Sequence, residues 1–218
     1  MERDIRNTPL FLEIENLHHD IRASGSGLIC DAGDLQAAPN GEVAVFTGTL
    51  SDGNVESTHI CSLDLKTKKT CVITYAPNND RLPRYSPDGT CIAFISDRAH
   101  SGDFQLYFYD FKTKSTSAAP SVHGWIEYHY WSPDGSKILL GVAGHGADMS
   151  GGQGAVTSRN QAVENVSWMP KVDGTENAFR WRSVWIYDFV THQLEQVLNP
   201  GINIWEANWC GDSSIIAV

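Results

Sequence analysis

A short turn sequence that recurs along the chain constrains the fold more than any other feature. It is clearest at residues 131–135 (WSPDG) and 85–89 (YSPDG), each between two apolar runs, with a variant at 38–41 (APNG). Pro sets φ at the first corner of a turn, Asp or Asn bonds back to the backbone, and Gly adopts the left-handed corner. Each copy therefore predicts a β-hairpin, with a degenerate fourth copy at 209–212 (WCGD).

The copies recur in phase. Pro39 and Pro87 are 48 residues apart, and Pro87 and Pro133 are 46 residues apart. A second mark, an Asp between two apolar residues and three residues before a Thr, recurs at matching positions: Asp64, Asp110 and Asp188. A period of about 40–50 residues with four strands per repeat is typical of a β-propeller. A β-sandwich also has short strands and frequent turns, but it does not predict this period.

We therefore predict an all-β chain that forms a partial β-propeller (TolB/WD40-like) of about three and a half four-stranded blades. The blades are expected at about 30–77, 78–120, 121–200 and, incompletely, 201–218. Residues 1–29 form an N-terminal segment, in which residues 9–14 suggest a short strand or an anchoring segment.

The bulk properties exclude some classes of partner. The 218 residues carry a formal charge of −10, and the densest basic stretch, residues 66–69 (KTKK), is interpreted as a solvated turn. Nucleic-acid binding needs clustered Lys and Arg, so we expect no nucleic-acid partner. No apolar run approaches the roughly 20 residues of a membrane helix, and no apolar segment of a signal peptide follows the charged start. We expect no membrane partner and a cytoplasmic location.

The five cysteines are odd in number and include no C-x-x-C pair. Because each lies in or beside an apolar or strand-like run, we expect buried, reduced thiols rather than disulfides or a zinc site. His18, His19 and His145 lack partners at metal-ligand spacing, and His129 is interpreted as a packed ring near an inner strand. No metal and no cofactor is therefore expected.

The third repeat carries an insertion at 144–182, between its second and third strands. A phosphate-binding loop would need a Gly-Lys-Ser/Thr run entering a helix, which is missing here. Two interpretations stay open. In one, the insertion is a lip over a binding site, with Arg180 and Arg182 as carboxylate clamps and Trp181 as a stacking surface. In the other, it is a packed loop whose arginines pair with local acids.

Catalytic patterns are missing from the sequence. No serine stands in the Gly-x-Ser-x-Gly pattern of a nucleophile elbow. The spacing of the carboxylates defines no acid–base pair. No catalytic residue is predicted.

Several longer sequence segments resemble the propeller of prolyl-oligopeptidase-family (S9) serine peptidases. The resemblance is strongest to the dipeptidyl-aminopeptidase and acylaminoacyl-peptidase branch of that family. The segments are residues 124–135 (GWIEYHYWSPDG), 138–148 (ILLGVAGHGAD), 166–170 (VSWMP), 179–185 (FRWRSVW) and 204–212 (IWEANWCGD). The resemblance covers roughly residues 30–218. In that family a propeller of usually seven blades caps an α/β-hydrolase domain that carries Ser, Asp and His. That hydrolase region has no counterpart here, so the resemblance assigns no catalytic residue.

The resemblance implies a non-catalytic propeller portion that gates and positions peptide substrates for a hydrolase domain. It also implies that the insertion faces the substrate chamber, with Arg180, Trp181 and Asp148 as substrate contacts. The alternative is a stand-alone propeller-like interaction scaffold derived from a peptidase. Uncovered blade edges also predict self-association of the chain.

Overall fold

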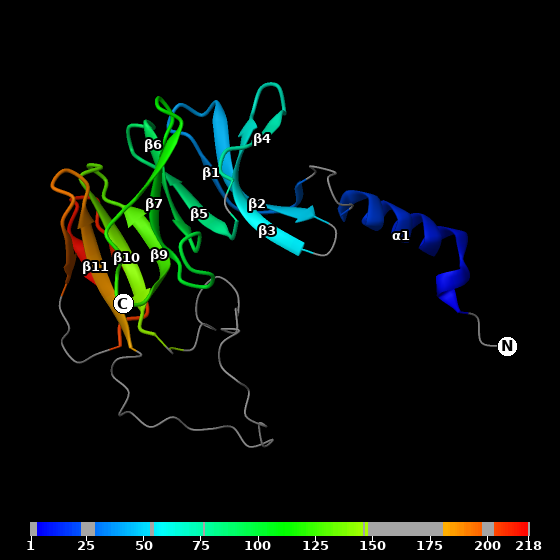
Figure 1. The fold of residues 1–218 in the computed structure, drawn as a ribbon. Coiled ribbons are helices and arrows are strands. Elements are labelled where there is room, and N and C mark those ends of the chain that lie inside the picture. Colours follow the sequence, from blue (N-terminus) through cyan, green and yellow to red (C-terminus); the bar gives the residue numbers. More distant parts are fainter. Residues whose placement is uncertain are drawn as a thin grey trace, which may run out of the picture. The chain divides into compact units, whose positions relative to one another are not determined.

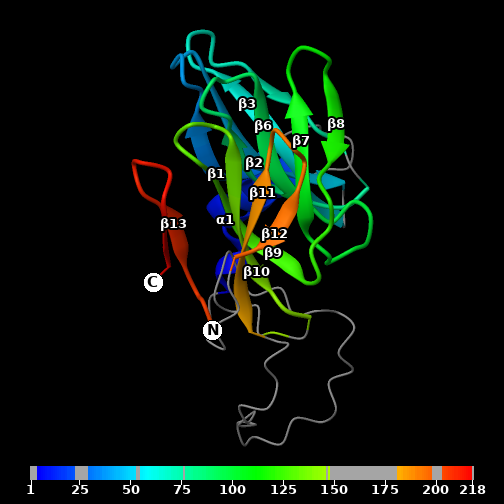
Figure 2. The ribbon, with the colours of Figure 1, turned by 90° about the vertical axis from the view of Figure 1, so that its left-hand side faces the viewer.

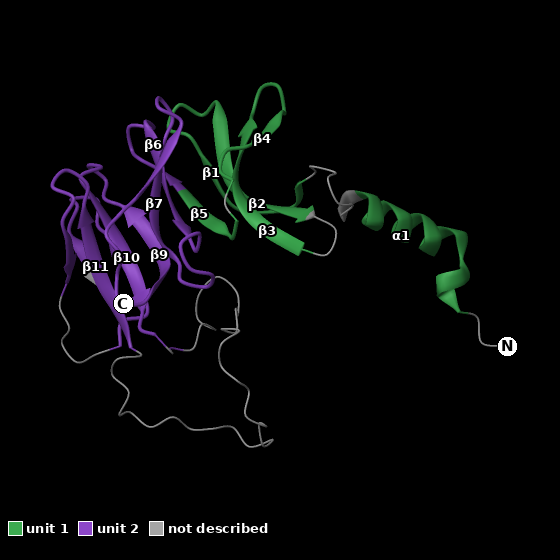
Figure 3. Cartoon of the chain, in the orientation of Figure 1, with its two compact units in different colours: residues 1–83 green, residues 84–218 purple. Residues whose placement is uncertain are grey.

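The computed structural model describes residues 4–22, 29–52, 55–75, 77–145, 147, 181–197 and 203–217. The chain divides into two compact units, residues 1–83 and 84–218 (Figure 3). The division falls inside a strand, β5 (Asp80–Tyr85).

Antiparallel strands dominate both units (Figures 1 and 2). The first sheet has the strand order β1 (Ile29–Ala37), β2 (Val43–Asp52), β3 (Val55–Asp64), β4 (Thr70–Val72). The second has the order β5, β6 (Cys91–Ser96), β7 (Gln105–Asp110), β8 (Ser115–Ala118). The third contains β9 (Trp125–Trp131), β10 (Lys137–Ala143), β11 (Arg182–Asp188) and β12 (Leu194–Gln196), again in chain order. A two-stranded sheet of β13 (Ala207–Trp209) and β14 (Ile215–Ala217) follows. These repeated meanders confirm the predicted partial propeller.

The hairpin turns form as the sequence predicts. At the left-handed corners Gly41, Gly89 and Gly135 have φ of +70°, +71° and +73°. In the third copy Asp134 accepts hydrogen bonds from the Ser132 hydroxyl at 2.6 Å and the Ser136 amide at 3.0 Å. These bonds, the Ser132 hydroxyl first, lower the pKa of Asp134 to about 2.

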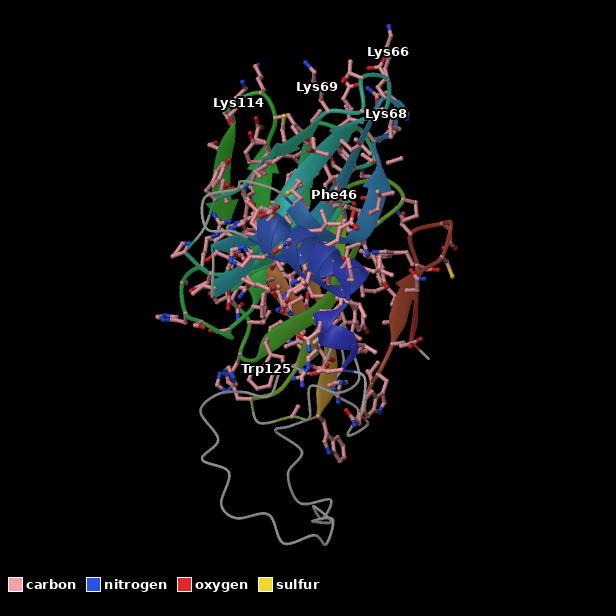
Figure 4. All side chains as sticks on the ribbon, turned by 90° about the vertical axis from the view of Figure 1, so that its right-hand side faces the viewer. Phe46, Lys66, Lys68, Lys69, Lys114 and Trp125 are labelled. Atoms are coloured by element: carbon pink, nitrogen blue, oxygen red, sulfur yellow. The ribbon has the colours of Figure 1, made fainter. Side chains whose placement is uncertain are left out.

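The second repeat mark is also a turn. The amides of Thr67, Thr113 and Thr191 donate to Asp64, Asp110 and Asp188 at 2.6, 2.7 and 2.8 Å. The residue after each Thr is left-handed: Lys68, Lys114 and His192. In the first copy the lysines Lys66, Lys68 and Lys69 are exposed, as labelled in Figure 4, so the predicted solvated turn is confirmed.

The expectation of a strand at residues 9–14 is wrong, because this segment lies in helix α1 (Pro9–Arg22). A short 3-10 helix at Ile5–Asn7 precedes it. Thr8 caps α1, since its hydroxyl accepts from the Phe11 amide at 3.3 Å, and Pro is well suited to the first helical position. Leu10, Ile14 and Leu17 recur at helical spacing, a period that the strand interpretation missed.

Within unit 2, neighbouring sheets pack against each other. The third and fourth sheets share a buried apolar cluster: Leu139, Val184, Ile204 and Ala207. Between the second and third sheets, the ring of Phe108 lies 5.5 Å from Tyr187 and 5.2 Å from Phe189, measured between ring centroids. Side-by-side packing of this kind is how propeller blades bury their faces.

The cysteine prediction holds in part. Cys61 and Cys91 are buried, Cys30 and Cys210 are half-buried, and all are free thiols. Cys71 is exposed, contrary to expectation, because it lies on the short outer strand β4, where two of the three residues are exposed. In the described part of the chain, no helix combines the length and apolar character needed to cross a membrane.

Candidate functional site

The end of the third sheet from which residues 144–182 depart gathers polar and aromatic side chains. The strand register creates it, because Ala143 at the end of β10 pairs with Trp125 of β9 and with Arg182 of β11. The Gly144 amide also donates to the Trp181 carbonyl at 3.4 Å, so the two ends of the insertion meet. Side chains far apart in sequence therefore lie at one edge.

The structure describes one of the three predicted contact residues. Arg180 and Asp148 lie outside the described residues. Trp181 lies just before β11 and is half-buried. Of the residues that the structure describes, Trp181 is the predicted contact found at this edge of the sheet.

Arg182 is a buried partner of an acid. Its guanidinium donates to both carboxylate oxygens of Glu127 at 2.8 and 2.9 Å. The two side chains are only 5% and 8% exposed. A bidentate pair in this setting neutralises the arginine within the fold. For Arg182, the geometry favours the packed-loop interpretation over the free carboxylate clamp.

The same arginine orders the residues that lead into the fourth sheet. Its guanidinium carbon lies 3.9 Å from the ring centroid of Trp205, a close cation–π contact. Its backbone amide donates to the side-chain oxygen of Asn203 at 2.6 Å, and its carbonyl accepts from the Ile204 amide at 3.1 Å. Trp205 is thereby held in place while 49% of its surface remains exposed. Trp205 therefore presents an aromatic surface at this edge.

Two histidines and a tryptophan form a second group. The rings of His123 and His145 lie 4.9 Å apart between centroids and are nearly perpendicular, at 89°. The Trp125 ring, labelled in Figure 4, lies 5.5 Å from His145. Both histidines are exposed, whereas the buried Trp125 Nε1 has no hydrogen-bond acceptor among the described residues. Sequence reasoning treated His145 as isolated, and only the register of β9 with β10 could have shown the pairing.

His129 lies inside the third sheet. It is 2% exposed, and neither ring nitrogen has a hydrogen bond of good geometry. Burial, then the nearby charge of Arg84, lowers its pKa from 6.5 to about 3, and the backbone of Ala93 offsets this only in part. The predicted packed ring is confirmed.

The buried thiols are not activated. Burial raises the pKa of Cys61 to about 11 and also raises that of Cys91. A nucleophilic cysteine needs a lowered pKa. Among the described residues, no group of three or more His, Cys, Asp or Glu is placed to hold a metal ion. As far as the structure describes it, the edge of the third sheet is a polar and aromatic surface.

Comparison with known proteins places this arrangement in the class of β-propeller domains. The β-propeller domain of the trilobed protease from Pyrococcus furiosus matches with a TM-score of 0.51 and 19% identity, over 78% of this chain and 42% of that one. Acylaminoacyl peptidase from Pyrococcus horikoshii matches with a TM-score of 0.53 and 19% identity, over 85% of this chain and 27% of that one. At these identities the likeness shows the fold.

The sequence comparison points to peptidases. The chain is 29% identical over 153 residues to the uncharacterized peptidase YuxL of Bacillus subtilis (strain 168), which covers 69% of this chain. The chain thus spans 22% of the length of that relative. No protein-family model matches. The relative and the solved structures together confirm the resemblance to the propeller part of S9 serine peptidases.

Proposed function

We propose that this chain is a non-catalytic β-propeller portion of an S9 serine peptidase, in the dipeptidyl-aminopeptidase/acylaminoacyl-peptidase branch. Its role is to gate peptide substrates and position them for an α/β-hydrolase domain. The observation that carries the proposal is the 29% identity to a peptidase over 153 residues of a chain whose sheets are those of a partial propeller. Most of that relative's length lies outside the match, which leaves room for a catalytic domain.

The edge of the third sheet supports the positioning role. The buried Arg182–Glu127 pair holds Trp205 as an exposed aromatic surface beside the base of the insertion. A surface that is ordered before binding loses less entropy when a peptide docks. We assign Trp181, with Arg180 and Asp148 from the insertion, to substrate contact. The five unpaired cysteines support a reducing, cytoplasmic location.

The experiment that tests the proposal starts with the coding sequence beyond Val218. We expect an in-frame Gly-x-Ser-x-Gly with later Asp and His. The joined protein should cleave short peptides and spare folded proteins, and removal of the present chain should abolish this size selection. Labelling of the isolated 218-residue chain by a serine-directed fluorophosphonate would overturn the proposal, as would a stop codon directly after Val218.

The contact residues are tested in the same joined protein. The double substitution Arg180→Ala/Trp181→Ala should lower kcat/KM for peptides by about tenfold or more, the loss expected from one or two strong contacts. Val190→Ala is the matched control, because Val190 is exposed on the turn after the far end of β11. Unchanged kinetics in the double variant would remove both residues from the site, while leaving the gating role intact.

A further inference from the structure

We propose that His123 and His145 form a surface site for a divalent transition-metal ion of the Zn²⁺, Ni²⁺ or Cu²⁺ class. The site lies at the edge of the third sheet, where Ala143 pairs with Trp125. Imidazole is the side chain that these ions prefer among nitrogen ligands.

The distance between the two rings suits one shared ion. Metal–nitrogen bonds of about 2.0–2.1 Å to two imidazoles at a near-tetrahedral angle place the ring centres about 5 Å apart. The centroids of His123 and His145 lie 4.9 Å apart. The centroid distance therefore matches the one that a shared ion requires, once the exposed side chains turn one nitrogen of each ring toward that ion.

The backbone that carries His123 is clamped on both sides. The buried side chain of Gln105 accepts from the Val122 amide at 2.9 Å and donates to the Gly124 carbonyl at 2.8 Å. Gly124 has φ of +143°, and a Cβ there would lie 2.3 Å from the Ala143 carbonyl oxygen. No other residue fits at this position, so the loop is held tightly against the end of β10.

His145 is held by its own surroundings. It directly follows the end of β10, its ring packs edge-on against Trp125, and the Ala147 amide donates to the Gly144 carbonyl at 2.9 Å to close a turn around it. Both imidazoles therefore project from ordered backbone. Ligands fixed before binding raise metal affinity, because less conformational entropy is lost.

The chemistry of the site limits what it can hold. No third His, Cys, Asp or Glu joins the pair among the described residues. This predicts an exchangeable ion rather than a structural zinc, which needs four protein ligands. Mg²⁺ and Ca²⁺ prefer oxygen ligands and should not bind.

The test is calorimetric titration of Ni²⁺, Zn²⁺ or Mg²⁺ alone into the tag-free chain. We expect one Ni²⁺ or Zn²⁺ per chain at this pair and no Mg²⁺ binding. His123→Ala and His145→Ala should each weaken the affinity at least about tenfold, since even loss of an outer partner of a metal ligand costs 10–100-fold. Addition of Cu²⁺ should quench tryptophan fluorescence, because Trp125 lies against His145.

His18→Ala/His19→Ala is the matched control, because it removes two neighbouring histidines from the exposed helix α1. This double variant should retain the Ni²⁺ site. Gln105→Ala should weaken Ni²⁺ binding without removing a ligand, because it releases the loop that carries His123. Equal Ni²⁺ affinity in wild type and in the His123→Ala/His145→Ala variant, with unchanged circular dichroism, would overturn the proposal.

Discussion

At the scale of single residues, the buried ionisable groups of the third sheet are the most consequential. His129, Glu127 and Arg182 all lie in or beside β9 and β11. His129 is neutral in the fold, whereas Glu127 and Arg182 neutralise each other. Because these groups are buried, the free energy of unfolding should fall if His129 becomes charged or if Glu127 or Arg182 loses its partner.

His129 should make stability depend on pH. Its pKa is about 3 in the fold and about 6.5 in the unfolded chain, so the unfolded chain binds more protons below pH 6.5. Stability should therefore fall as the pH drops from 6.5 toward 3, by about 2 kcal/mol between pH 7 and pH 5. Urea unfolding at both pH values measures this. His129→Leu should abolish most of the difference, and the exposed His100→Ala should preserve it; an unchanged difference in His129→Leu would contradict the assignment.

The Arg182–Glu127 pair should couple strongly. Glu127→Gln or Arg182→Met alone leaves a buried group without its charged partner, and we expect each to cost about 3 kcal/mol of unfolding free energy. The double variant should cost less than the sum of the two, because both charges leave together. A double-mutant cycle by urea unfolding measures the coupling, and simple additivity would show that the pair acts through other partners.

Ser213 occupies a strained position. It has φ of +64° at the corner where the earlier copies of the turn have glycine. A non-glycine residue in this region costs about 1–2 kcal/mol, and Ser213→Gly should recover about 0.5–1 kcal/mol after the added flexibility of the unfolded chain. Thermal unfolding monitored at the tryptophans reports the gain. The exposed Ser214→Gly is the control, and a loss of stability in Ser213→Gly would contradict this account.

At the scale of elements, successive sheets of unit 2 are joined by a repeated hydrogen bond. The indole of Trp131 donates to the Arg84 carbonyl at 3.1 Å, and the indole of Trp209 donates to the Tyr130 carbonyl at 2.9 Å. Trp131 and Trp209 are the last residues of β9 and β13, each the first strand of its sheet. The acceptor residue in each case directly precedes the corresponding aromatic residue of the preceding sheet, Tyr85 or Trp131. The tryptophan of the WSPDG segment thus binds one sheet to the preceding one, while the rest of the segment forms the turn.

Trp131→Phe should test this attachment. It removes the indole N–H and keeps an aromatic ring against Phe108 and Phe189. We expect a loss of about 1 kcal/mol from the hydrogen bond, with some further loss from the smaller ring. Chemical denaturation measures the change. Trp125→Phe is a suitable control because the Trp125 Nε1 has no hydrogen-bond acceptor among the described residues, and an equal loss in both variants would argue against a specific role of the Trp131 bond.

At the scale of the whole molecule, the fourth sheet bears on assembly. Among the described residues it contains only β13 and β14, and the outer edge of β14 pairs with no further strand. Unpaired edges are templates for pairing between chains. We expect the isolated 218-residue chain to self-associate at tens of micromolar in sedimentation velocity. A stable monomer that binds no apolar dye would contradict the expectation.

Local chemistry determined much of this protein. The hairpin turns depend on residues that are neighbours in sequence, and so do the strands between them. Examples are the turns at Gly89 and Gly135 and those at Asp110 and Asp188. The regular spacing of these turns along the sequence therefore predicted the blades. Helix α1 was missed because its period of Leu10, Ile14 and Leu17 lies in a segment outside the repeats.

Only the tertiary structure decided the arrangement at the edge of the third sheet. Glu127 is 55 residues from Arg182, and His123 is brought to His145 by the register of β9 with β10. Such contacts depend on strand pairing and on packing between sheets, which no local pattern encodes. The sequence by itself therefore determined the repeated β units, whereas the pairing of charges, the burial of His129 and the meeting of the two histidines arose from strand register within the third sheet and from packing between neighbouring sheets.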